Sequence, residues 1–188
     1  CTVVIRPASA TPLTTLLLAK TFLEAGLPAG VLNVITGLDH AVTDAILEDP
    51  RLRKLSFTGS TGVGANLLGK AAKHVLRTSM ELGGNAPFIV FDDADLDQAI
   101  AMLLNGKTRR VSVCNATETV LLDARLADHD KLAVIEALQG AGVQVHGDVD
   151  THAAFGAQVV PATEADFAEE YLSMDIASAV VDGVEGAI

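Results

Sequence analysis

The chain has 188 residues, which is enough to bury the core of one medium-sized domain or of two small ones. Hydrophobic residues make up 49% of the chain and charged residues 20%, which excludes a disordered protein, and the apolar runs are too short to span a membrane. The formal net charge of −11 argues against a nucleic-acid-binding surface.

The first hundred residues alternate between short strand-like and longer helix-like segments. Short apolar runs predict five strands, near residues 2–6, 31–36, 54–58, 78–82 and 87–91. Apolar residues at helical spacing predict helices between them, over residues 11–26, 41–49, 61–76 and 94–107. Thr11 is expected to cap the first helix, with Pro12 in its first turn and Gly26 at its end.

This alternation, with its short connections, is typical of a parallel sheet covered by helices. Five strands within about 90 residues are close to a complete nucleotide-binding sheet. The sequence therefore predicts an α/β fold, an open parallel Rossmann-like sheet with helices on both faces. All five of these strands are expected in that one sheet.

The alternation continues more loosely after residue 106. Strands are predicted over residues 116–126, 143–148, 157–162 and 176–183, helices over 128–142 and 164–173, and a loop over 148–157. The charge balance changes at the same point. Residues 1–105 carry 8 basic and 10 acidic residues, whereas residues 106–188 carry 5 and 14. This shift predicts two domains, the second being part of another α/β domain.

Two strand ends are candidates for binding a phosphate. In "FTGSTGVG" (57–64) a strand end, three glycines and a helix start lie within eight residues, although a plain strand-to-helix turn explains this spacing equally well. Arg6 ends the first strand and Ser9 follows it. A cation and a hydroxyl at that edge of the sheet could hold a ribose phosphate, and a solvated arginine beside a cap residue is the competing interpretation.

Two further side chains are candidates for catalysis. Glu81 ends a strand before two glycines, where a carboxylate could be a general base or simply exposed. Cys114 follows Lys107, Arg109 and Arg110, and positive charge lowers the pKa of a thiol, which favours a nucleophile. The alternative is a small buried filler, because free cysteine is among the most buried residue types.

The remaining cysteine and histidine residues indicate no further site. Two cysteines cannot form a disulfide framework, and no Cys/His spacing predicts a metal site. No signal peptide is visible, so a cytoplasmic location is expected. The chain begins at Cys1 without a methionine and is expected to be a piece of a longer protein. The five histidines are expected on the surface: His40, His74, His129, His146 and His152.

Residues 1–105 resemble the cofactor domain of aldehyde dehydrogenases, particularly the succinate-semialdehyde type, through "VVIRPASATPLTTLLLAKTFLEAGLPAGVLNVITG", "KLSFTGSTGVG" and "SMELGGNAPFIVFDDADLDQAI". Residues 106–188 resemble gamma-glutamyl phosphate reductase (glutamate-5-semialdehyde dehydrogenase), a distant member of the same superfamily that acts in proline biosynthesis, through "VSVCNATETVLL" and "VVPATEADFAEEYLSMDIASAVVDGVEGAI". The resemblance implies a dinucleotide-binding domain over residues 1–105 and a partial catalytic domain over residues 106–188, joined as a hybrid.

The resemblance also implies roles for individual residues. Cys114 occupies the nucleophile position of both families, and Glu81 matches the glutamate that activates water. Glu170 matches a residue that contacts the nicotinamide ribose. Gly59 and Ser60 match the turn beside the pyrophosphate.

Cofactor preference and phosphate binding depend on four other residues. Arg6 stands where the family usually has lysine, and Ser9 stands where NAD-preferring members often have glutamate. The resemblance therefore implies NADP as cofactor, with NAD possible. Arg109 and Arg110 are candidates for holding a substrate phosphate, and no metal is implied.

The implied function is NAD(P)-dependent oxidation of an aldehyde, or reduction of an acyl phosphate, through a cysteine thioester. The substrate would be of the succinate-semialdehyde or glutamate-5-semialdehyde type, and the full-length protein is expected to form a homo-oligomer. A non-catalytic dinucleotide-binding or structural fragment is the alternative. It is kept because the segment with the side-chain oxyanion donor would precede Cys1 and the end of the catalytic domain is absent.

Overall fold

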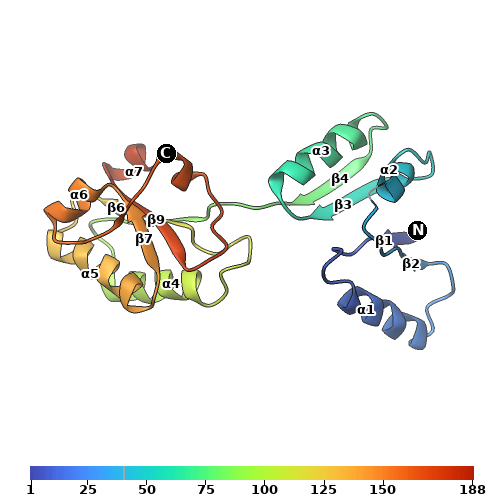
Figure 1. The fold of residues 1–188 in the computed structure, drawn as a ribbon, viewed down its shortest axis with the longest axis horizontal. Helices are drawn as coiled ribbons and strands as arrows, with labels where there is room; N and C mark the ends of the chain where they lie inside the picture. Colours follow the sequence, from blue (N-terminus) through green and yellow to red (C-terminus); the bar gives the residue numbers. More distant parts are fainter. Residues whose placement is uncertain (40) are drawn as a thin grey trace. The chain divides into compact units, whose positions relative to one another are not determined.

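The computed structural model describes residues 1–39 and 41–188, which divide into two compact units. The first unit comprises Cys1–Thr58 and Gly62–Met80, and the second comprises Gly59–Thr61 and Glu81–Ile188. Figure 1 shows the course of the chain through both units. In the described part of the chain, no helix has the length and apolar composition needed to cross a membrane.

The first unit contains two separate pairs of hydrogen-bonded strands, β1–β2 and β3–β4. β1 and β2 run parallel, with Val3 opposite Leu32, and α1 connects them. α1 follows Pro12 as its N-cap, one residue later than the expected Thr11 cap, and the chain turns away where Gly26 adopts a φ of +90°. The elements of this part are β1 (Val3–Ile5), α1 (Leu13–Glu24), β2 (Leu32–Val34), α2 (Ala41–Leu47), β3 (Lys54–Thr58), α3 (Thr61–Ala72) and β4 (Arg77–Glu81).

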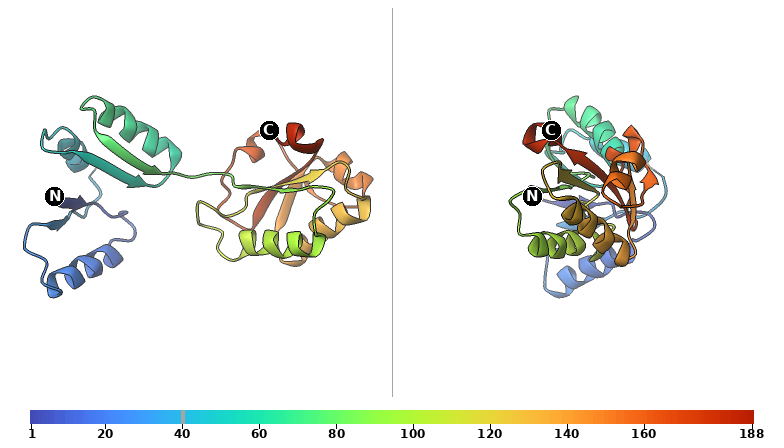
Figure 2. Two further views of the ribbon diagram at one scale, coloured as in Figure 1. Left: turned by 180° about the vertical axis from the view of Figure 1, so that it is seen from behind. Right: turned by 90° about the vertical axis from the view of Figure 1, so that its left-hand side faces the viewer.

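The second unit is built on a five-stranded parallel sheet in the order β5-β6-β9-β7-β8. Helices α4 and α5 lie on one face of this sheet, and α6 and α7 lie on the other (Figures 1 and 2). Its elements are β5 (Pro87–Val90), α4 (Leu96–Thr108), β6 (Thr119–Asp123), α5 (Asp128–Gly140), β7 (Gln144–Gly147), α6 (Val149–Ala154), β8 (Val160–Pro161), the 3₁₀ helix η1 (Glu164–Phe167), β9 (Asp175–Val181) and α7 (Gly183–Ala187).

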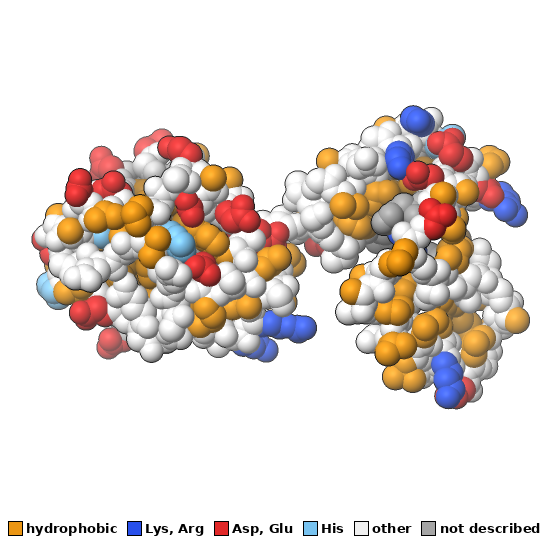
Figure 3. Space-filling model, in the orientation of Figure 1, with side chains coloured by type: hydrophobic (Ala, Val, Ile, Leu, Met, Phe, Trp, Pro, Cys, Tyr) orange, Lys and Arg blue, Asp and Glu red, His pale blue; other side chains and the backbone are white. Residues whose placement is uncertain are grey.

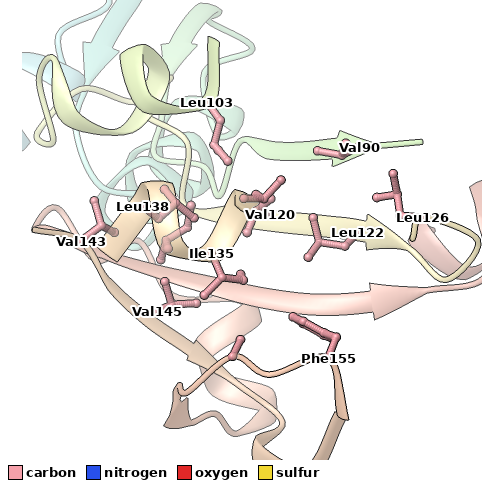
Figure 4. Packing of buried hydrophobic residues seen from close by; sticks show 13 residues of the cluster. Val90, Leu103, Val120, Leu122, Leu126, Ile135, Leu138, Val143, Val145 and Phe155 are labelled. Carbon is pink, nitrogen blue, oxygen red and sulfur yellow. The ribbon is translucent and has the colours of Figure 1, made fainter. Parts of the chain in front are cut away.

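The hydrophobic core of the second unit is centred on β6. All five residues of β6 are buried, because the strand is paired on both edges and covered on both faces. Apolar side chains from α4, α5 and the neighbouring strands pack around it (Figure 4). The cluster includes Val90, Leu103, Val120, Leu122, Ile135, Leu138, Val145, Phe155 and Ile176.

The α/β class with parallel strands is confirmed, but the expectation that the first five strands share one sheet is wrong. The strands form two pairs and one five-stranded sheet. β5 does not pair with β4, the strand before it in the sequence, but with β6. In this pair Pro87 lies opposite Thr119 and Val90 lies opposite Leu122. Burial explains this choice, since Val90 is fully buried in the core of the second unit.

Two further differences concern boundaries. The division between compact units lies near residue 80, not near residue 105, because β5 and α4 pack with the second half of the chain. Within residues 148–157, where a loop was expected, the structure has α6. Asp148 caps this helix by accepting a hydrogen bond of 2.8 Å from the Thr151 N–H. An aspartate at this position is a sequence feature that favours the start of a helix.

The first unit leaves much of its apolar surface uncovered. No residue of α1 is buried, although the helix carries Leu13, Leu17 and Phe22. Figure 3 shows hydrophobic side chains over this unit and acidic side chains over the second unit. Burial of apolar area therefore stabilises the second unit more than the first.

Candidate functional site

The stretch Glu81–Asn85, at the end of β4, begins at one predicted site residue and adjoins three others, Gly59, Cys114 and Glu170. The Gly59 N–H donates a hydrogen bond of 3.0 Å to the Glu81 carbonyl, so the predicted pyrophosphate turn lies beside the predicted base. The Glu170 carboxylate lies directly against Gly83, so a larger residue at this position would require the flexible Glu170 side chain to move. A Cβ on Gly84 would lie 3.7 Å from the Cys114 carbonyl oxygen. The Glu170 carboxylate and the backbone of the Cys114 turn therefore both lie against the short segment that begins at Glu81.

Cys114 lies in an exposed turn between α4 and β6. The turn is closed by a hydrogen bond of 2.9 Å from the Ala116 N–H to the Val113 carbonyl. This exposure contradicts the interpretation of Cys114 as a buried filler. Arg109 and Arg110 are also exposed, and among the described residues neither side chain forms a hydrogen bond or an ion pair.

The two ends of the loop that carries Cys114 are joined by a buried ion pair that sequence reasoning missed. Lys107 Nζ lies 2.8 Å from Glu118 Oε2, and the two side chains are 0% and 1% exposed. The Thr117 N–H donates a hydrogen bond of 3.1 Å to the Gly106 carbonyl beside this pair. Since Glu118 neutralises Lys107, the positive charge expected near Cys114 would have to come from Arg109 and Arg110.

The Glu170 segment is anchored by its neighbour Tyr171. The Lys107 ammonium lies 6.0 Å from the centroid of the Tyr171 ring. The pKa of the Tyr171 phenol is raised mainly by burial and secondly by the 2.8 Å hydrogen bond that the phenol donates to Asp166. Hydrogen bonds from the backbone and hydroxyl of Thr163, and then from Tyr171, lower the pKa of Asp166 to about 2. Asp166 is therefore ionised at neutral pH. Its hydrogen bond with the Tyr171 hydroxyl fixes the side chain that directly follows Glu170.

The expectation of surface histidines is wrong for His152. His152 is fully buried, donates from Nδ1 to the Asp148 carbonyl at 2.8 Å and has Nε2 2.9 Å from Ser178 Oγ. Burial lowers the pKa of His152, so this ring is a neutral structural group. His146 is half-buried and stacks on Tyr171. Of the others, His74 and His129 are exposed, and His40 lies outside the described residues.

In the first unit, Arg6 and Ser9 converge on one acceptor. Arg6 Nη2 donates to the Gly37 carbonyl at 3.1 Å, and Ser9 Oγ donates to the same oxygen at 3.2 Å. The cation at the end of β1 and the exposed hydroxyl are therefore neighbours in space, as binding of one phosphate by both would require.

The first unit has a partly open hollow between α2 and α3. It has a volume of about 320 Å³ and a largely apolar lining. Thr43 Oγ1 is buried at its wall and has no hydrogen-bond partner among the described residues, so a bound polar group would satisfy it. The space next to Gly62, on the wall of the hollow, is empty, since nothing lies within 4 Å of a Cβ placed there. The hollow is lined by Thr43, Asp44, Gly62, Val63, Asn66, Leu67 and Lys70.

Known proteins resemble the chain along most of its length. The profile of the aldehyde dehydrogenase family matches residues 1–185. A succinate-semialdehyde dehydrogenase from Paenarthrobacter nicotinovorans is 53% identical over 129 residues, which are 68% of this chain and 29% of that protein. The NADP⁺ succinate-semialdehyde dehydrogenase of Escherichia coli is 47% identical over 148 residues, which are 78% of this chain and 30% of that protein.

A solved structure extends the similarity to the whole chain. An NADP-dependent enzyme from E. coli superposes with a TM-score of 0.78 and 33% identity, covering 100% of this chain and 48% of that one. The chain spans about 30% of the length of the two curated relatives. The family match crosses position 105 without a break, and none of these relatives is a gamma-glutamyl phosphate reductase.

Proposed function

The chain belongs to the aldehyde dehydrogenase family, and from this we propose that it carries the dinucleotide site and the nucleophile of an NAD(P)-dependent enzyme that oxidises a semialdehyde. The observation that supports the proposal is that the stretch beginning at Glu81 adjoins the Glu170 carboxylate, at Gly83, and the backbone of the Cys114 turn, at Gly84. The names of the two curated relatives favour succinate semialdehyde as the substrate type.

In the proposed reaction, the Cys114 thiolate adds to the aldehyde carbon, and the carbonyl oxygen becomes an alkoxide. Bound NAD(P)⁺ would supply the hydride acceptor, because loss of hydride from that carbon turns the adduct into a thioester. Glu81 would then take a proton from a water molecule that attacks the thioester carbon. The carbon–sulfur bond breaks, the Cys114 thiolate is restored, and the acid leaves.

The first unit offers residues suited to the cofactor. Arg6 and Ser9 together present a cation and a hydroxyl that suit a 2′-phosphate, which favours NADP. The hollow between α2 and α3 suits the flat adenine ring, with Thr43 as a polar partner. Gly59 and Ser60, before the N-terminus of α3, would lie beside the pyrophosphate, and Glu170 would contact the nicotinamide ribose.

Ser9→Glu should erase or reverse the preference for NADP over NAD. The new carboxylate would neutralise Arg6 and repel a 2′-phosphate, at a cost of about 1–3 kcal/mol in NADP affinity. The measurement is a titration of each variant with both dinucleotides. The matched control is Thr14→Glu, which adds the same charge at an exposed position of α1. Equal affinities of both dinucleotides for both Ser9 forms would contradict the assignment.

The Glu81→Gln variant tests the proposed base. An amide cannot take the proton from water, so hydrolysis should slow roughly 100-fold or more and the thioester should accumulate on Cys114. Intact-mass measurement after mixing with succinate semialdehyde and NADP⁺ should show the added succinyl group with an equivalent amount of NADPH. Without NADP⁺ the succinyl adduct should be absent, because the hydride then has no acceptor.

Two other functions compete with the oxidation of a semialdehyde. The exposed guanidinium groups of Arg109 and Arg110 would suit an acyl phosphate, which is the reductase chemistry of glutamate-5-semialdehyde metabolism, although the relatives described above give no support to a role in proline biosynthesis. The second alternative is a dinucleotide-binding fragment without catalysis. Dinucleotide binding with neither a Cys114 adduct nor NADPH formation would identify this second case.

A further inference from the structure

Asn85 makes hydrogen bonds to two distant segments of the second unit. Its Nδ2 donates to the Glu169 carbonyl at 2.8 Å, and its Oδ1 accepts a hydrogen bond from the Thr119 hydroxyl. Its backbone carbonyl accepts from the Glu118 N–H at 3.0 Å. One half-buried side chain therefore uses both ends of its amide, and the residues that it joins lie 34 and 84 positions away in the sequence.

Each segment that Asn85 joins carries a residue of the proposed site. Asn85 itself is four residues after Glu81. Glu118 is four residues after Cys114, at the end of the loop whose base the Lys107–Glu118 pair closes. Glu169 directly precedes Glu170, whose carboxylate lies against Gly83. No other side chain described above contacts both the Glu170 segment and the start of β6 through hydrogen bonds.

The chemistry of asparagine fits this position closely. The Glu169 carbonyl can only accept a hydrogen bond, so its partner needs an N–H or O–H group. The Thr119 hydroxyl donates here, so its partner needs a lone pair. Aspartate in its ionised form could serve Thr119 but not the Glu169 carbonyl, and aliphatic residues could serve neither.

We propose that Asn85 is a positioning residue that fixes the Glu170 segment and the exit of the Cys114 loop relative to the stretch that begins at Glu81. The significance of this arrangement for catalysis rests on the function proposed above. The arrangement itself concerns contacts within the second unit and can be measured without turnover.

The test compares two variants that each remove one side of the amide's contacts. Asn85→Asp keeps the acceptor for Thr119 and loses the donor to Glu169, whereas Thr119→Val loses only the Thr119 contact. Hydrogen exchange of the Ala168 amide, which donates to the Ala165 carbonyl at 3.1 Å next to Glu169, should accelerate about tenfold in Asn85→Asp, the change expected for the loss of one hydrogen bond in a local opening. Thr119→Val should affect that amide much less, and amides of β6 and β9 should stay protected in both variants.

Alkylation provides a second readout that a purely stabilising role would not change. Both Cys1 and Cys114 are exposed, so Cys1 is an internal reference for reagent and conditions. In Asn85→Asp the rate at Cys114 should change several-fold relative to Cys1. Unchanged exchange of the Ala168 amide, or equal acceleration throughout the second unit, would overturn the proposal. Absence of dinucleotide binding in the unmodified chain would instead contradict the proposed function, and the exchange result would stand.

Discussion

Cys114→Ser should abolish formation of NADPH from any aldehyde substrate while leaving the fold and the dinucleotide affinity nearly unchanged. A serine hydroxyl is a far weaker nucleophile than a thiolate without an adjacent base. The exposed position means that the substitution removes one sulfur atom and creates no cavity. Activity, circular dichroism and a dinucleotide titration measure the three quantities, and Cys1→Ser is the control that should retain activity.

Labelling kinetics test the same residue without turnover. Because both cysteines are exposed, a faster alkylation of Cys114 than of Cys1 would report thiolate reactivity and not access. Bound NADPH should change the rate at Cys114 and leave the rate at Cys1 unaffected. Equal rates for the two thiols, unaffected by NADPH, would make Cys114 an ordinary surface cysteine.

Lys107→Met should destabilise the second unit by about 3–5 kcal/mol, the cost of leaving one member of a buried ion pair without its partner. Glu118 would then be a buried carboxylate with neither oxygen paired, since its Oε1 already lacks a partner among the described residues. The substitution also removes the cation next to the Tyr171 ring. Urea denaturation followed by circular dichroism measures the change.

Two further variants make this result specific. Lys131→Met removes a lysine from the same unit whose partner, Asp128, is 73% exposed, and it should cost at most about 1 kcal/mol. The double variant Lys107→Met with Glu118→Leu should recover much of the lost stability, because it leaves no buried charge unpaired. If Lys107→Met were as stable as Lys131→Met, the ion pair would not be important for stability.

The sequence was sufficient to predict helices and strands whose formation depends on neighbouring residues in the chain. The helix expected over 94–107 is α4, because Asp95 caps it, accepting a hydrogen bond from the Gln98 N–H, and its apolar residues recur at helical spacing. The partner of β5 was not predictable in this way. Neighbouring strands usually pair, but burial of Val90 against the core of the second unit favoured β6.

Some residues of the candidate site could likewise be proposed from the sequence, and others could not. Cys114 and Glu81 could be proposed from the residues around them, whereas Glu170 was proposed from the family resemblance alone. Asn85 and the Lys107–Glu118 pair were missed because a hydrogen bond or ion pair formed by the tertiary fold leaves no periodic pattern in the sequence. A buried lysine is especially hard to recognise, since lysine is almost always exposed.

The position of Glu81, Asn85, Cys114 and Glu170 in one unit has an evolutionary consequence. All four lie within the continuous stretch Glu81–Ile188, whereas Arg6 and Ser9 lie in the other unit. If Arg6 and Ser9 select the dinucleotide as proposed, substitutions within the first unit could alter that preference while leaving every residue of the second unit unchanged. Under the proposed roles, descendants of such a gene could exchange nucleotide specificity and keep the covalent chemistry, so the two properties could be selected separately.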